Sequence, residues 1–490
     1  MHDGDLTTLS LASAAVLLRD GRLSPSVYVS AFFARIERYE PALHAFIQAD
    51  KEGALATASE VEREIGHGHW RGPLHGIPVA VKDIFDVAGQ PTTNHSRILM
   101  GSIAVRDSFV VKRLRAAGAI LIGKTAMHEF ATGGPSFDLP WPPARNPWSP
   151  QCHPGGSSSG SGVAVAAGFV PVALGTDTAG SVRNPATACG IVGMKPTYGT
   201  IGRTGVFPLS RTLDHIGVLT RSTADNAIVL SQLLAQDPED PDCVKHPSID
   251  MQSELEKGVA GLRLAVIVEF GMTAQPEIRA AFEQCLNQFA RLGAEISRVK
   301  LSPLSTYTDT GRLILRAEAY SVHEGWIKSR PGDYGRRTLS RISPGAEISA
   351  ADYIRAQNKR AELTREFDEM MAPFDAALCL SSLELPCAID DDALIDKTYD
   401  RQARTPFNLV GAPAISLPMG FSVSNLPIGL QIIGKRFSER TLYRVAHAYE
   451  AATDWHRRRP DLDRTLDQVE PSMFPADTDM ESHNAPTSTY

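Results

Sequence analysis

Apolar residues recur at helical spacing in the N-terminal part of the chain. This spacing predicts helices over residues 8–19, 25–38 and 51–65. The pattern then changes to a continuous apolar run over residues 78–82, which predicts a short buried strand. Three amphipathic helices therefore precede the first predicted strand.

Further along, strands and helices alternate. A helix predicted over residues 108–117 leads into a strand over 119–123. A strand over 263–268, a helix over 276–292 and a strand over 294–299 repeat the pattern. Such alternation is typical of a sheet covered by helices on both faces. We therefore expect an α/β fold, a single large domain with a mixed, mostly parallel twisted sheet sandwiched between helices.

The C-terminal half continues this pattern with one polar interruption. Residues 235–260 are rich in Asp and Pro, which predicts a surface excursion. Residues 304–372 have a mostly helical pattern, and strands are predicted over 414–418 and 428–433. A helix is predicted over about 439–453.

Composition narrows the classes of function. The chain has 490 residues, 43% of them hydrophobic, and its net charge of −7 argues against a nucleic-acid scaffold, which needs a basic face. Six cysteines without a C-x-x-C pair are typical of a reducing compartment. No apolar run reaches the ~18 residues of a membrane span. The first apolar segment is preceded by acidic residues rather than basic ones, unlike a signal peptide, so the prediction is a cytoplasmic protein.

Two glycine turns that carry serines lie between residues 154 and 199. Ser157 stands in the first turn and Ser181 in the second, 24 residues later. Lys82 ends the predicted strand 75 residues before Ser157. A protonated lysine, with an ordinary pKa of about 10.4, is no base, but burial lowers that pKa. Apolar residues precede Lys82, so this pattern favours a serine nucleophile activated by lysine without histidine.

Other interpretations of the same residues are weaker. The block around Ser157 fits the G-x-S-x-G nucleophile elbow, but that motif needs a strand before it, and Pro150 and Pro154 interrupt the preceding segment. A phosphate loop would need Lys and then Ser or Thr after Gly160. A flexible Gly/Ser linker is excluded by the apolar residues that follow at once. The histidines show no metal-ligand spacing, so no metal and no cofactor is expected.

Several motifs together resemble the amidase signature family, hydrolases with a Ser–cis-Ser–Lys triad. The resemblance covers roughly residues 5 to 455 and is carried by blocks in the right order, namely Gly76 to Asp83, Gly123 to Thr125, Arg145 to Trp148, the glycine-serine block, Lys195 to Thr197 and Phe407 to Pro418. It implies a family domain over residues 1–465, with a core motif over 76–200 and a variable, pocket-shaping region over about 235–400. The tail over 471–490 is rich in Pro, Ser, Thr and Asp, and is expected to be disordered.

The resemblance also implies a role for each triad residue. Ser181 corresponds to the nucleophile, Lys82 to the base, and Ser157 to the bridge between them, placed after a cis peptide bond from Gly156. The backbone N–H groups of Thr178, Ala179 and Gly180 correspond to the oxyanion hole.

Residues around the nucleophile complete the predicted site. Many family members have glycine where this chain has Ala179, which would be strained if the position needed a positive φ. Asp177 and Arg183 bracket the nucleophile turn and are expected to hold it. Asn184 is predicted to face the acyl group, and the loop from Phe137 to Trp141 is predicted to shape the pocket.

The resemblance implies an enzyme that hydrolyses carbon–nitrogen bonds. The first hypothesis is an amidase that cleaves a small-molecule amide through an acyl-enzyme on Ser181, with esters or carbamates as further substrates. Its partners would be that amide and water, without nucleic acid or membrane, and a homodimer stays open. The alternative is the glutaminase-type subunit of a tRNA-dependent amidotransferase, which needs partner chains.

Overall fold

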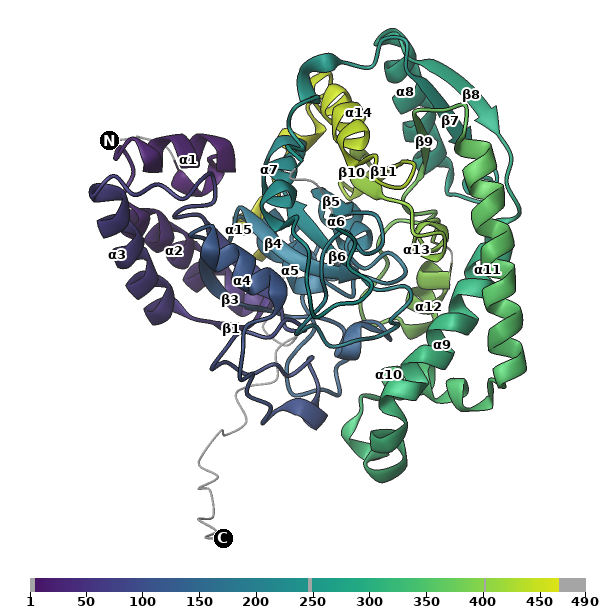
Figure 1. The fold of residues 1–490 in the computed structure, drawn as a ribbon, viewed down its shortest axis with the longest axis horizontal. Coiled ribbons are helices and arrows are strands. Elements are labelled where there is room, and N and C mark those ends of the chain that lie inside the picture. Colours follow the sequence, from purple (N-terminus) through teal and green to yellow (C-terminus); the bar gives the residue numbers. More distant parts are fainter. Residues whose placement is uncertain (1–4, 246–248, 401, 467–490) are drawn as a thin grey trace.

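The computed structural model describes residues 5–245, 249–400 and 402–466. The predicted tail over 471–490 lies outside the described residues. An 11-stranded sheet runs through the middle of the molecule, with helices on both sides (Figure 1). The strands, in chain order, are Phe46–Ala49 (β1), Pro78–Lys82 (β2), Ile120–Thr125 (β3), Val172–Asp177 (β4), Val192–Lys195 (β5), His215–Thr220 (β6), Arg263–Ile267 (β7), Glu295–Val299 (β8), Ala376–Leu380 (β9), Ala414–Phe421 (β10) and Pro427–Ile433 (β11).

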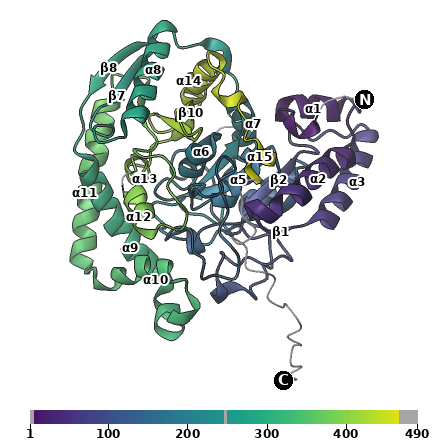
Figure 2. The same cartoon turned by 180° about the vertical axis from the view of Figure 1, so that it is seen from behind.

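The helices lie at both ends of the sheet and over its faces. Turned by half a revolution, the molecule shows α1, α2 and α3 at one end and the long helices α9 and α11 at the other (Figure 2). The helices are Leu11–Arg19 (α1), Pro25–Leu43 (α2), Lys51–Gly66 (α3), Phe109–Ala116 (α4), Ser159–Ala166 (α5), Arg183–Cys189 (α6), Thr223–Leu233 (α7), Pro276–Arg291 (α8), Leu304–Ser329 (α9), Arg336–Ile342 (α10), Ala350–Met371 (α11), Asp392–Asp400 (α12), Thr405–Leu409 (α13), Glu439–Ala451 (α14) and Leu462–Leu466 (α15).

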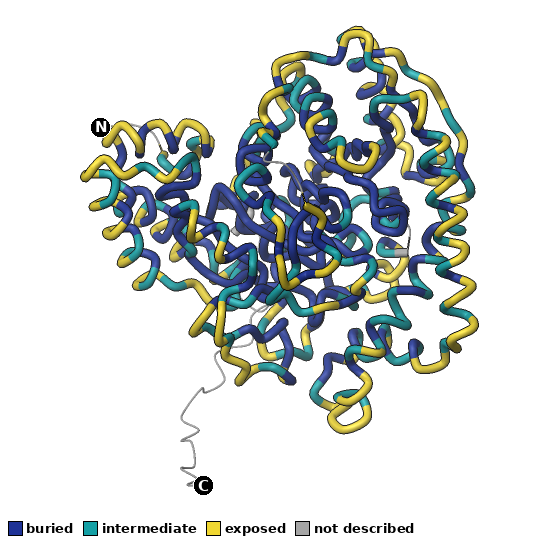
Figure 3. The backbone as a smooth tube through the Cα atoms, in the orientation of Figure 1, coloured by how far each residue is buried: buried dark blue, intermediate teal, exposed yellow. Residues whose placement is uncertain are grey.

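Side chains alternate between two apolar layers because successive strand residues point to opposite faces. In β4, Val172 and Leu174 join the core that includes helices α7, α8 and α14, whereas Ala173 joins the core formed with α2, α3 and α5. Every residue of β4 is buried. The buried residues form the centre of the molecule, and the exposed ones follow the outer helices (Figure 3). The sheet is therefore covered on both faces, as the alternation of strands and helices predicts.

The strand order is β1-β3-β2-β4-β6-β5-β10-β11-β9-β7-β8. The mixed sheet in one large domain confirms the predicted fold class, but the expectation of mostly parallel pairing is wrong. Among the strands of the described residues, the pairs β2–β3, β2–β4, β7–β8 and β7–β9 are parallel and the other six are antiparallel. The residues between β10 and β11 form a short turn, which joins only antiparallel neighbours.

The acidic stretch over residues 235–260 is not a plain surface excursion. Asp237 and Asp240 are 3% and 7% exposed, and Asp240 accepts a hydrogen bond from Arg203 Nε at 3.0 Å. The Asp237 carboxylate accepts from the Thr204 N–H at 3.2 Å. These carboxylates are buried because they pair with donors of the preceding loop, a contact that composition does not reveal.

Helix α5 was not predicted, although it follows the glycine turn of Ser157. All of its residues are buried, so it has no polar face. Hydrophobic periodicity identifies a helix by the contrast between its faces, and here that contrast is absent. The helix packs against β2, β3 and β4, and so it places the glycine turn at the end of β2.

Candidate active site

Lys82 is the last residue of β2 and is fully buried. Its Nζ donates to Ser157 Oγ at 2.9 Å and to Thr176 Oγ1 at 2.8 Å. Thr176 belongs to β4, the parallel neighbour of β2. The sheet thus brings together a lysine and a serine that are 75 residues apart in the sequence.

Burial lowers the pKa of Lys82 to about 7, although the charges of Asp214 and Asp177 act in the opposite direction. The neighbouring Asp83 does not hold the lysine charge, because its carboxylate pairs with Lys124 Nζ at 2.8 Å. Consecutive strand residues point to opposite faces, as expected. A lysine with a pKa near 7 is partly neutral at physiological pH and can accept a proton.

The turn before α5 places Ser157 beside the lysine. The peptide bond between Gly156 and Ser157 is cis, as the resemblance implies. A Cβ at Gly156 would lie 2.1 Å from the ring of His128, so this position has room only for glycine. Burial, followed by the charge of Lys82, lowers the pKa of His128 well below its ordinary value, so this histidine is neutral.

The turn that carries Ser181 is held by the carboxylate of Asp177 at the end of β4. This carboxylate accepts hydrogen bonds from the Gly180 N–H at 2.8 Å and from the Val182 N–H at 3.1 Å. Gly180 has a φ of +124°, and a Cβ there would lie 2.8 Å from Arg404. Glycine is therefore required at this position on two independent grounds.

The predicted oxyanion donors differ in their availability. The N–H of Gly180 is already bonded to Asp177, so it does not point freely into the site. Thr178, Ala179 and Ser181 line the pocket. Ala179 has no positive φ, so its methyl group does not strain the turn.

Arg183 and Asp177 form a buried ion pair behind the turn that carries Ser181. Both side chains are 0% exposed, and Arg183 Nη2 lies 2.8 Å from Asp177 Oδ1. The guanidinium also donates to Asn408 Oδ1 and Gln431 Oε1, both at 2.6 Å. Burial alone would raise the pKa of Asp177, but the charge of Arg183 outweighs it and holds that pKa well below its usual value. The pair therefore connects the turn to α13 and β11.

Breaking this pair should destabilise the fold. We expect Arg183→Met to lower the free energy of unfolding by about 3–5 kcal/mol, because it leaves the Asp177 carboxylate buried without its countercharge. Chemical denaturation measures this loss. The double change Arg183→Met with Asp177→Asn removes the charge as well and should recover part of it. A single variant as stable as the unchanged protein would mean that the pair does not support the turn.

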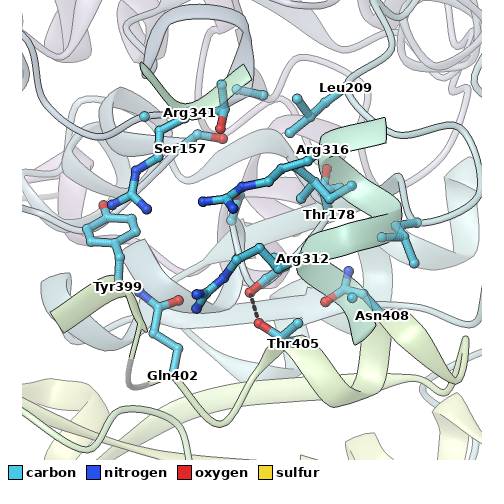
Figure 4. A pocket seen from close by; sticks show the side chains of 18 of the residues that line it. Ser157, Thr178, Leu209, Arg312, Arg316, Arg341, Tyr399, Gln402, Thr405 and Asn408 are labelled. Carbon is cyan, nitrogen blue, oxygen red and sulfur yellow. Dashed lines mark hydrogen bonds between the residues drawn. The ribbon is translucent and has the colours of Figure 1, made fainter. Parts of the chain in front are cut away.

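Both serines line one pocket, a cavity of about 160 Å³. Its walls include apolar residues such as Leu209 and three arginines, Arg312 and Arg316 from α9 and Arg341 from α10. Figure 4 shows the guanidinium groups of Arg312 and Arg316 pointing into this pocket, with Arg341 beside Tyr399. The site thus joins a candidate nucleophile to a positively charged wall.

A second cavity, of about 580 Å³, adjoins the first. It is lined by Thr176, Thr178 and Asp214, among others, and shares Thr178 and Leu209 with the first. Thr178 Oγ1 donates to Asp214 Oδ1 at 2.5 Å, and burial raises the pKa of Asp214 to about 6. The cavity reaches Thr176, whose hydroxyl accepts a hydrogen bond from Lys82 Nζ.

The three predicted substrate contacts lie outside the first pocket. Asn184 Nδ2 donates to the Gly156 carbonyl at 3.2 Å and thus supports the serine turn. Phe137 is 54% exposed and its ring lies under Arg145. The carbonyl of Trp141 contacts His95 Nε2 at 3.0 Å. None of the three is among the residues that line the pocket in the described part of the chain.

The sequence interpretation missed the three arginines, Thr176, Tyr399 and Gln402. Arg312 and Arg316 are four residues apart on one helix, and this spacing alone places them on one face. The spacing does not show that this face of the helix points towards the two loops that carry Ser157 and Ser181.

Among the described residues, no group of three or more His, Cys, Asp or Glu side chains is placed to hold a metal ion. No helix in that part of the chain is both long and apolar enough to cross a membrane.

A buried lysine bonded to a serine, set in a helix-covered mixed sheet, places the chain among enzymes that act on amide carbon–nitrogen bonds. The chain belongs to the amidase family, whose model matches residues 28–443.

The similarity to its relatives extends over nearly the whole length of both chains. A glutamyl-tRNA(Gln) amidotransferase subunit from Roseiflexus sp. (strain RS-1) is 36% identical over 484 residues, which cover 93% of this chain and 99% of that protein. The solved structure of the corresponding glutamyl-tRNA(Gln) amidotransferase subunit from Thermotoga maritima has a TM-score of 0.78 at 33% identity, covering 92% of this chain and 96% of that one. Another solved chain comes from a vestigial protein complex that reveals the evolutionary origins of an s-triazine catabolic enzyme. It has a TM-score of 0.85 at 28% identity, covering 90% of this chain and 98% of that one.

These similarities correct two expectations from the sequence. The first hypothesis, an amidase for a small-molecule amide, is contradicted, because the full-length relative belongs to an amidotransferase of several chains. The expected set of partners, only a small amide and water without nucleic acid, is contradicted for the same reason, and one similar structure is itself a protein complex. The findings favour the alternative hypothesis.

Proposed function

We propose that this chain is the glutaminase-type subunit of a tRNA-dependent amidotransferase complex, in which it releases ammonia from an amide donor through an acyl-enzyme on Ser181. The observation that carries the proposal is the 36% identity to the Roseiflexus glutamyl-tRNA(Gln) amidotransferase subunit, which extends over 93% of this chain and 99% of that protein. The hydrogen bond from Lys82 Nζ to Ser157 Oγ supports the amide-cleaving step, as does the position of Ser157 and Ser181 in the wall of one pocket.

Lys82 acts as the base through Ser157. With a pKa near 7, neutral Lys82 accepts a proton from Ser157, which takes the proton of Ser181 as the latter attacks the amide carbonyl. The same path returns a proton to the departing ammonia. Water then attacks the acyl group on Ser181 and gives a proton to Lys82 through Ser157. The same path returns that proton to Ser181 Oγ as the ester C–O bond breaks and the carboxylic acid leaves. Each step uses only side chains of this protein and water.

The oxyanion that forms during attack needs donors at the pocket wall. The backbone N–H groups of Ala179 and Ser181 belong to residues of that wall, and Thr178 adds a third. Gly180 instead fixes the shape of the turn through its bond to Asp177. Asp177 and Arg183 hold the nucleophile turn, and neither lines the pocket.

The test is reconstitution with the other subunits of the complex. We expect the assembled complex to convert glutamyl-tRNA into glutaminyl-tRNA when glutamine is supplied, and the complex with Ser181→Ala to require free ammonia instead. An assembled complex that leaves glutamyl-tRNA unchanged with both glutamine and ammonia would overturn the proposal.

Ser157 provides a sharper test of the proton path. If it carries the proton, Ser157→Ala should lower the rate of amide cleavage by about 10²–10⁴-fold, the range of a positioned acid–base group. The double change Ser157→Ala with Lys82→Ala should be scarcely slower than the slower single variant, because residues that act as one unit are not additive. Fully additive losses in single-turnover rates would show that the two residues act independently.

Two finer expectations stay predictions. Esters and carbamates have a similar carbonyl geometry and are predicted to acylate Ser181 as well. A cytoplasmic location also remains a prediction.

A further inference from the structure

We infer that Asp214 is a positioning residue for the amide-cleaving step: it fixes Thr178 at the pocket wall, and its charge keeps Lys82 basic enough to take the proton of the nucleophile. This inference rests on the proposed function, because it concerns the step that acylates Ser181. Asp214 lies in the wall of the second cavity, next to the pocket of the two serines.

The register of the sheet brings Thr178 and Asp214 together. Strands β4 and β6 are antiparallel, and Asp177 lies opposite His215. The residue after Asp177 therefore faces the residue before His215. Thr178 is 2% exposed, and its Oγ1 donates to Asp214 Oδ1 at 2.5 Å. This bond ties the first residue of the nucleophile turn to the loop that precedes β6.

The other carboxylate oxygen holds a second segment of the pocket wall. Asp214 Oδ2 accepts from the backbone N–H groups of Leu209 at 2.9 Å and Ser210 at 3.0 Å. Leu209 and Thr178 both line the pocket of the serines (Figure 4). One carboxylate thus sets the separation of two wall residues. It also fixes the backbone at Thr178, a proposed oxyanion donor, and such donors act only when they are held where charge develops.

The charge of Asp214 also acts on the base. Burial lowers the pKa of Lys82, and the charge of Asp214, followed by that of Asp177, raises it again. Asp177 is balanced by direct contact with Arg183 at 2.8 Å, and the nearby His128 is neutral. Asp214 therefore keeps the pKa of Lys82 near 7 rather than lower. A general base works best when its pKa lies near the working pH.

Asp214 is charged where Lys82 loses its proton. Burial raises the pKa of Asp214 to about 6, while its hydrogen bonds and the charge of Arg203 act in the opposite direction. Arg203 is itself paired with Asp240 at 3.0 Å and with Asp242 at 2.7 Å. An amide oxygen could accept the same two backbone N–H groups. The charge, more than the hydrogen bonds, therefore distinguishes an aspartate at this position.

Asp214→Asn tests the charge through the pH dependence of covalent labelling. Phenylmethanesulfonyl fluoride labels Ser181 in the full chain, and the labelling rate constant should rise with pH through about 7 in the unchanged protein. In Asp214→Asn we expect the midpoint to fall by on the order of one pH unit and the plateau to fall by about 10-fold. An unmoved midpoint in the folded variant would overturn the inference. Asp214→Ser removes the same charge with a smaller side chain and should show the same shift.

Thr178→Val separates the hydrogen bond from the charge. This variant keeps the carboxylate, so the plateau should fall by about 10-fold while the midpoint stays near 7. The double change with Asp214→Asn should have a plateau scarcely below that of the slower single variant, because residues that act as one unit are not additive. Additive losses would show that Asp214 does not act through Thr178.

Glu318→Gln is the matched control. Glu318 comes from α9, lines the same second cavity, and accepts from Ser210 Oγ at 2.7 Å and from the Thr212 N–H at 3.0 Å. It thus anchors the same loop, but the carboxylate charges that act on Lys82 are those of Asp214 and Asp177. We expect its midpoint to match that of the unchanged protein. A shift as large as that of Asp214→Asn would assign the effect to a loosened loop and overturn the role of the charge.

Failure of this inference can be told apart from failure of the proposed function, because labelling needs neither glutamine nor tRNA. A moved midpoint in Asp214→Asn, together with an assembled complex that leaves glutamyl-tRNA unchanged, would refute the proposed function alone. Conversion of glutamyl-tRNA together with an unmoved midpoint would refute the role of Asp214 alone.

Discussion

Ser181→Ala should abolish amide cleavage, with a loss on the order of 10⁵–10⁶-fold in kcat. The serine stands in the turn fixed by Asp177 and lines the pocket together with Ser157. Without its hydroxyl no acyl-enzyme forms there, and any residual rate reflects binding and polarisation of the amide alone. Ammonia release under saturating donor measures the loss.

A nearby serine provides the control for this change. Ser159→Ala alters the same glycine-serine block, and Ser159 does not line the pocket with Ser181. We expect this variant to retain a rate close to that of the unchanged protein. Substantial turnover in Ser181→Ala, with the fold intact, would place the nucleophile elsewhere.

Replacement of Lys82 should be the next most damaging change. Lys82→Met removes the base and should lower kcat on the order of 10⁴-fold. In the unchanged protein the neutral lysine is the active form, so the rate should rise with pH through about 7 and level off above it, since burial lowers the pKa of Lys82 to about 7. An ordinary lysine would place this limb near its usual pKa of 10.5.

Lys82→Arg separates charge from proton transfer. Guanidinium stays protonated, so this variant should be as inactive as Lys82→Met. Stability gives an independent readout. Because the folded pKa is lowered, the unfolded chain binds more protons between pH 7 and 10.5, and stability should rise with pH over that window. Lys82→Met should lose this rise. An active Lys82→Arg variant would exclude lysine as the base.

Much of the fold could be predicted from hydrophobic patterning, and the reason differs between elements. Strand β2 is a continuous apolar run, and helices α8 and α14 have a clear helical period. All three lie close to their predicted bounds. Helix α5 is buried all round and shows no period. The excess of antiparallel pairs depends on which strands become neighbours, a long-range choice that local patterns do not record.

The candidate site likewise contains residues that the sequence predicts and residues that it does not. Lys82, Ser157 and Ser181 are carried by short motifs with fixed local geometry, so the sequence predicts them together. The arginines of α9 and α10 lie far away in the sequence, within the region over about 235–400 that is predicted to be variable. Their place at the pocket depends on tertiary packing. The hydrogen bond from the Gly180 N–H to the Asp177 carboxylate likewise depends on the folded turn and could not be predicted from the sequence.

The expected partners show a different limit of sequence composition. A net charge of −7 argues against a chain that itself coats nucleic acid. It does not argue against a chain whose partner holds the tRNA, because such a chain needs only a protein interface. Net charge describes the whole surface, whereas assembly depends on particular patches.

The most direct test of the central claim is to identify the residue that carries the acyl group. The assembled complex is mixed with glutamine, quenched in acid within one turnover, digested and mapped by mass spectrometry. We predict an ester-linked acyl group on the peptide that contains Ser181, present in the unchanged protein and absent in Ser181→Ala. An acyl group found instead on Ser157, and retained in Ser181→Ala, would contradict it.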